Sequence, residues 1–208
     1  MDEPHVPVSH NNGATEIVAA ARISAHLLKV QKNAQRISMT AKNLSVISAR
    51  IGAEAGSLKE LSKFFDSFAQ QSIRTSAAIN KVAKHIVTDM MTCWRTQLCM
   101  GKVQKVLSKP ELTAPALNTR LALISQDATS VRQRNFVHQR ELGECLDDLT
   151  KCMQTMQIIA VNARIEACGL LDYQRQLTEL SGSIENYTSA IFGEIKQCEH
   201  LLREIVSQ

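Results

Sequence analysis

The sequence predicts an all-α protein: an elongated antiparallel four-helix coiled-coil bundle made of two tandem helical hairpins. Three observations support this prediction. Apolar residues make up 44% of the 208 residues but aromatic residues only 4%, which disfavours β-sandwiches and barrels, because their strands use many aromatic and β-branched residues. The prolines lie at Pro4, Pro7, Pro110 and Pro115 and leave two long segments free of helix-breaking proline. Apolar residues recur at alternating spacings of three and four through both segments.

The four apolar runs keep the same seven-residue repeat over long distances. They extend from Ala20 to Ile51, Leu58 to Leu107, Leu117 to Ala163, and Leu177 to Ile205. A heptad repeat sustained in this way predicts helices that supercoil left-handedly and pack knobs into holes. Some seam positions are polar, which costs stability but restricts register. They are Ser48, Ser72, Thr75, Asp89, Thr96, Asn135, His138 and Glu194.

Helix boundaries follow from caps, glycines and prolines. Asn12 or Thr15 can cap the first helix, because a short polar side chain accepts hydrogen bonds from free N–H groups. Gly52 and Gly56 bracket a turn, and Gly169 to Asp172 form a second one. The stretch from Ser108 to Pro115 joins the two hairpins, with Pro115 in the first turn of the third helix.

These boundaries divide the chain into three parts. Residues 1–13 are predicted to form a flexible N-terminal tail. Residues 14–110 form hairpin 1, with its tip at about residues 52–57, and residues 111–208 form hairpin 2, with its tip at about residues 162–177.

The two halves of the chain resemble each other around their turns. Residues 49–53 read ARIGA and residues 163–167 read ARIEA, while residues 58–62 read LKELS and residues 177–181 read LTELS. This repeat predicts duplication of one hairpin. The halves differ in charge: the first, through Pro110, has 15 Lys/Arg and 7 Asp/Glu (+8), and the second has 9 and 13 (−4). Opposite charges favour pairing of the two hairpins with each other.

Composition and the first residues suggest a cytoplasmic protein. No window approaches 18 uninterrupted apolar residues, so the sequence predicts no membrane insertion. The start, MDEPHVPVSH, lacks the apolar segment of a secretory signal. The net charge of +4 and the lack of a Lys/Arg cluster do not indicate nucleic-acid binding. The six cysteines contain no C-x-x-C pair and are interpreted as packing residues in a reducing compartment rather than as metal ligands or disulfides.

The sequence contains no motif that indicates an enzymatic function. Glycine-rich phosphate loops, nucleophile elbows and H-E-x-x-H zinc motifs are absent, and no cofactor is expected. His26, followed by Lys29, offers one alternative, a phosphotransfer module, although Val30 stands where such modules carry a glycine. His138 lies seven residues from Cys145, about 10 Å along a helix, too far for one metal ion. Trp94 is expected to pack inside the bundle.

The third and fourth runs contain a motif beside the second turn. Residues 158–167 read IIAVNARIEA, and this segment resembles the hairpin tip of bacterial chemoreceptors, the methyl-accepting chemotaxis proteins. Their tip reads approximately N-A-x-I-E-A-A-R-A-G-E-x-G-x-G-F. The resemblance covers about 45 residues of hairpin 2. Hairpin 1 matches less well, with Ser48 and Gly52 where Asn and Glu are expected.

The chemoreceptor resemblance implies a cytoplasmic signalling hairpin that docks a chemotaxis histidine kinase, its coupling protein or other receptor tips. The corresponding polar residues here are Asn162, Glu166 and Arg175, with Leu177 in place of a family phenylalanine, and the apolar docking face comprises Ile158, Val161 and Ile165. Gly169 stands where the family has an arginine, and no paired Glu/Gln site suited to adaptation methylation is present.

One chain here supplies two hairpins, whereas receptors of this family contribute one each to a dimer. The resemblance therefore implies a monomer, or at most a weak oligomer, that mimics the tip region of a receptor dimer. The alternative is a helical scaffold that has lost kinase contact.

Overall fold

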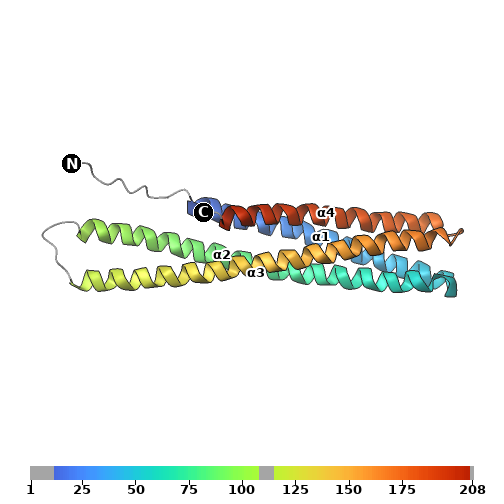
Figure 1. The fold of residues 1–208 in the computed structure, drawn as a ribbon, viewed down its shortest axis with the longest axis horizontal. Coiled ribbons are helices and arrows are strands. Elements are labelled where there is room, and N and C mark those ends of the chain that lie inside the picture. The colour runs from blue at the N-terminus through green and yellow to red at the C-terminus, as the bar shows by residue number, and fades with distance from the viewer. Residues whose placement is uncertain (1–11, 108–114, 207–208) are drawn as a thin grey trace.

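The computed structural model describes residues 12–107 and 115–206, which form an antiparallel four-helix bundle (Figure 1). Its long helices are α1 (Asn12–Ile51), α2 (Gly56–Leu107), α3 (Pro115–Cys168) and α4 (Gln174–Val206), with a short 3-10 helix, η1 (Ala53–Ala55), between α1 and α2. Helix α1 packs on α2 and α4, and α3 also packs on α2 and α4, so the four helices form a ring in chain order. The predicted fold class is confirmed.

The helix ends follow the punctuation of the sequence. Gly52 interrupts the first hairpin with a positive φ of 90°, which residues with a β-carbon rarely adopt. Pro115 is the first residue of α3, where its missing N–H leaves no hydrogen bond unmade. The second turn spans residues 169–173. Helix α1 begins at Asn12, so the first two residues of α1 fall within the predicted tail; residues 1–11 lie outside the described part.

The core is a narrow column along the bundle axis. Its buried side chains include large residues, such as Phe65 and Leu149, and small ones, such as Ala34 and Ala163. Two of the polar seam residues, Ser48 and Ser72, are buried and donate to carbonyls of their own helices at 2.8 Å. The other six are half-buried. Small and hydroxyl-bearing residues let the helices approach closely but bury little apolar area.

Two polar seam residues join neighbouring helices by side-chain contacts. Glu194 of α4 is bonded to His26 of α1 at 2.5 Å. Asp89 of α2 accepts from Arg134 of α3 at 3.3 Å. These contacts tie α1 to α4 and α2 to α3, the two interfaces between the hairpins, and so restrict the register in which the hairpins can pair.

The bundle is not uniform along its length, because α2 and α3 continue beyond the ends of α1 and α4 (Figure 1). The continuous core ends at Met90 on α2 and Leu142 on α3. Trp94 lies just past this end and is 46% exposed, so the prediction that it packs inside the bundle is wrong. Its heptad position is correct for packing, but the bundle is only two helices thick there.

No helix in the described part of the chain is both long enough and apolar enough to cross a lipid bilayer.

Candidate functional site

The outer face of α3 near the second turn carries three exposed apolar side chains. Ile158 and Ile165 are each 65% exposed and Val161 is 43% exposed. The neighbouring positions Ala160 and Ala163 point into the core and are fully buried. The described part of the chain therefore leaves much of this apolar stripe exposed, and such a surface is available to a partner.

Beside this stripe lies a groove between α2 and α3. It is lined by Ser57, Glu60 and Leu61 from α2 and by Asn162, Ile165 and Glu166 from α3. The Ser57 hydroxyl donates to Glu166 Oε2 at 2.7 Å across the groove. Seven residues after Ser57, Phe64 occupies the same heptad position and is 53% exposed, which extends the apolar surface along α2.

The structure brings together five of the seven predicted partner-binding residues. Ile158, Val161, Asn162, Ile165 and Glu166 share one end of α3 on its exposed side.

The other two predicted residues lie on α4, apart from this surface. The Arg175 side chain is 92% exposed and its Nε lies 3.3 Å from Glu179 Oε1. Leu177 is fully buried in the core. Its side chain is therefore not on the surface that a docking partner would meet, because its heptad position faces the bundle axis.

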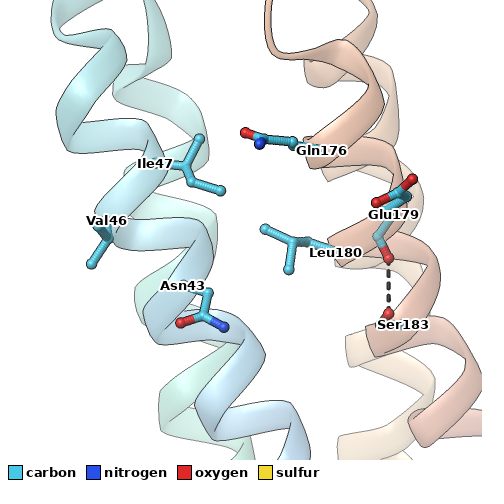
Figure 2. Close-up of a pocket in the computed structure, with 7 residues that line it drawn as sticks. All are labelled: Asn43, Val46, Ile47, Gln176, Glu179, Leu180 and Ser183. Carbon is cyan, nitrogen blue, oxygen red and sulfur yellow. Dashed lines mark hydrogen bonds between the residues drawn. The ribbon is translucent and has the colours of Figure 1, made fainter.

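A second groove occupies the interface between α1 and α4. Figure 2 shows Asn43, Val46 and Ile47 on α1 opposite four residues of α4. The α4 residues are Gln176, Glu179, Leu180 and Ser183. Ser183 donates to the backbone carbonyl of Glu179 at 2.9 Å, a bond within α4 (Figure 2). The Glu179 carboxylate accepts from Arg175 Nε at 3.3 Å.

On their α2 and α4 sides, the two grooves use equivalent positions of the internal repeat. The repeat that aligns residues 58–62 with 177–181 also aligns Glu60 with Glu179 and Leu61 with Leu180. Each groove thus combines the start of one hairpin's second helix with the end of the other hairpin's first helix. The chemoreceptor-like motif covers only the α3 side; the internal repeat is the sequence signal that points to Glu60, Leu61 and their α4 counterparts.

His26, considered above for phosphotransfer, belongs to a charged contact between α1 and α4. Its Nδ1 lies 2.5 Å from Glu194 Oε2, and Lys29 Nζ lies 3.3 Å from Glu194 Oε1. The His26 side chain is 17% exposed. Val30, which stands where phosphotransfer modules carry glycine, is fully buried in the core.

The six cysteines are all free thiols in widely different surroundings. Cys152 and Cys198 are buried, Cys93 and Cys145 are half-buried, and Cys99 and Cys168 are exposed. Burial raises the pKa of the Cys198 thiol to about 12, with further contributions from Glu194 and Glu199. Burial also raises the pKa of Cys145 and of Cys152. Within the described ranges, no group of three His, Cys, Asp or Glu residues is arranged to hold a metal ion.

The raised pKa of Cys198 predicts that the folded protein loses stability at alkaline pH. The folded bundle holds Cys198 as the neutral thiol, whereas in the unfolded chain its pKa returns to about its ordinary value of 9.0. Between about pH 9 and 12 the unfolded state therefore releases protons that the folded state keeps, and the free energy of unfolding falls as pH rises. Urea unfolding between about pH 8 and 11 measures this fall.

The Cys198→Ala variant controls for the other groups that titrate in this range. It should be less stable at about pH 8, because it leaves a small cavity, yet lose less stability with rising pH. An equally steep loss in the variant would show that Cys198 does not contribute.

Comparison with known proteins found no counterpart. No protein-family model matches the chain, and neither the curated proteins nor the solved structures contain a match. What the fold and the grooves define is therefore the class: an antiparallel four-helix bundle with an exposed apolar stripe beside one interhelical groove.

Proposed function

We propose that this protein is a chemoreceptor-like signalling or adaptor protein that docks other proteins through the tip of its second hairpin and has no enzymatic activity. The observation that carries the proposal is the exposed stripe of Ile158, Val161 and Ile165 beside Asn162 and Glu166. These are the residues that the resemblance to chemoreceptor tips assigns to docking. The partners it implies are a chemotaxis histidine kinase, its coupling protein or receptor tips.

The physical basis for docking is an exposed apolar stripe with polar residues beside it. Ile158 and Ile165 are each 65% exposed. Removing such apolar side chains from water stabilises a complex by about 25 cal/mol per Å² of apolar surface buried. Asn162 and Glu166 border the stripe and offer hydrogen-bonding groups at its rim, where polar contacts direct orientation. Helical presentation keeps these groups rigid, which lowers the entropic cost of association.

A binding experiment with purified kinase and coupling protein tests the proposal. We expect the wild-type chain to capture at least one of them, and Ile165→Ala and Glu166→Ala each to weaken capture by about tenfold. The matched control is Leu28→Ala, an exposed apolar residue (59%) on hairpin 1 that lies in neither groove, which should bind as wild type. Absence of binding by the wild-type chain would overturn the proposal and leave the helical scaffold without kinase contact.

The single chain takes the place of the receptor dimer in this proposal, since it already supplies both hairpins of the bundle. Light scattering should accordingly give a mass near that of one chain, 23.0 kDa. A mass near twice this value would contradict the pseudo-dimer arrangement while leaving the docking face to be judged by the binding experiment.

A further inference from the structure

The opposite end of the bundle has a surface that the proposed tip function does not use. Here α2 and α3 continue past the ends of α1 and α4 (Figure 1). We call α2 residues 91–107 and α3 residues 115–137, which lie beyond the continuous core that ends at Met90 and Leu142, the two-helix extension. At about 1.5 Å per residue, the α2 part alone is about 25 Å long. Of its residues with described side chains, only Ala128 and Val131 are buried. One side of the extension therefore lacks the layer that α1 and α4 form elsewhere.

Two aromatic side chains of the extension occupy heptad positions that, in the four-helix part, face α1 or α4. Trp94 is four heptads after Asp66, which accepts a hydrogen bond from Ser38 of α1. Phe136 is one heptad before Gly143, where an added β-carbon would meet Leu202 of α4 at 3.6 Å. Trp94 is 46% and Phe136 65% exposed. Both aromatic residues thus occupy helix-packing positions at which no helix of the described residues packs.

The extension is also strongly basic, unlike the rest of the bundle. Its described residues contain six Lys/Arg and one acidic residue, Asp127, a balance of +5. The remaining described residues, 12–90 and 138–206, contain 17 Lys/Arg and 16 Asp/Glu, a balance of +1. Arg132 lies two heptads before Leu146, a core position, but is exposed because no described residue covers it there. A partner that binds this face is therefore expected to carry acidic groups that pair with the Lys and Arg side chains, as well as apolar groups that cover the aromatic rings.

We propose that the two-helix extension receives an acidic amphipathic helix of a partner protein, seated in line with α1 and α4 against Trp94 and Phe136. Acidic side chains flanking an apolar stripe would pair with Arg132 and its basic neighbours, and the stripe would cover the two rings. A helix fits better than a flat anionic surface, because the aromatic residues follow the heptad lines on which this chain already receives its own helices. A second copy of this end fits poorly, because two +5 surfaces repel.

Trp94 is the only tryptophan in the chain, so its fluorescence reports directly on this face. The probe is a synthetic helical peptide of about 21 residues, without tryptophan, with leucine at heptad core positions and glutamate beside them. We expect saturable binding with a blue shift of Trp94 emission, because its ring leaves water. A peptide of the same composition with scrambled leucine spacing should bind about tenfold more weakly.

Charge reversal locates the site. The triple variant Arg95→Glu, Lys102→Glu and Arg132→Glu should weaken binding of the labelled peptide by about tenfold, and Phe136→Ser by about fivefold. The matched control, Lys32→Glu, Lys42→Glu and Arg74→Glu, makes the same charge change on exposed residues of the four-helix part. The affinity of this control variant for the peptide should stay within about twofold of the wild-type affinity at physiological salt, because charges are screened beyond about 8 Å there.

Several results would overturn this assignment. Equal weakening by both triple variants would show nonspecific charge attraction, and equal binding of the scrambled peptide would exclude recognition of a helix. Binding to phosphatidylserine vesicles that blue-shifts Trp94 and is not displaced by the peptide would assign the face to a lipid surface. Self-association that buries Trp94 and blocks the peptide would assign it to a second copy. None of these results depends on whether the tip of α3 binds a kinase.

Discussion

Replacing Phe65 with alanine should destabilise the protein by about 3–5 kcal/mol. Phe65 is the largest of the fully buried side chains in the described core. The core column around it contains many alanines and serines, so few neighbouring side chains can move in to fill the space. An overall stability of about 5–15 kcal/mol is usual for a folded domain, and the variant should therefore lose a large share of it. Urea unfolding followed by circular dichroism measures the change.

The adjacent residue provides a matched control. Phe64 has the same side chain on the same helix but is 53% exposed, so Phe64→Ala should change the free energy of unfolding by only about 0.5 kcal/mol. A larger loss in Phe64→Ala than in Phe65→Ala would mean that the heptad register of α2 is wrong by one residue, because such a shift would exchange the environments of the two rings.

Replacing Gly52 with alanine should cost about 1–3 kcal/mol. Gly52 has φ 90° and ψ −141°, a backbone conformation in which almost only glycine is found. Its carbonyl accepts from the Ala55 N–H at 3.2 Å and its N–H donates to the Ser48 carbonyl at 3.1 Å, so the conformation is required by the turn. No atom lies within 4 Å of an added β-carbon. The expected cost is therefore backbone strain alone, and thermal unfolding should show it.

Gly56, at the start of α2, should respond in the opposite direction. Its φ of −57° and ψ of −42° are helical, and an added β-carbon there also meets no atom within 4 Å. Gly56→Ala should stabilise the protein by about 0.5–1 kcal/mol, because alanine loses less backbone entropy on folding. If both variants were destabilised alike, the positive φ of Gly52 could not be the cause.

The sequence predicted the fold because heptad spacing and helix punctuation are local signals. Gly52 and Pro115 marked helix ends through their backbone restrictions, and the seam residues Ser48 and Ser72 lie in the core as the repeat required. Trp94 was mispredicted for a nonlocal reason. Its heptad position is a packing position, but whether a neighbouring helix reaches it depends on where α1 begins opposite α2.

The candidate site was predicted only in part, for the same reason. The exposed stripe of Ile158, Val161 and Ile165 was singled out by its motif, and its exposure agrees with its heptad positions. The α2 side of the groove, with Ser57 bonded to Glu166, joins residues 109 positions apart. Leu177 was placed among docking residues by its match to a family motif, whereas its side chain faces the bundle axis and is fully buried.

By itself, the sequence determined four helices, their turns and their inward faces, since each depends on residues within a few turns of one another. The tertiary structure alone decided which helices are neighbours, how the two grooves are assembled from both hairpins, and where the bundle thins to two helices. Those features depend on the register between long helices, and contacts such as His26 with Glu194, 168 residues apart, fix that register.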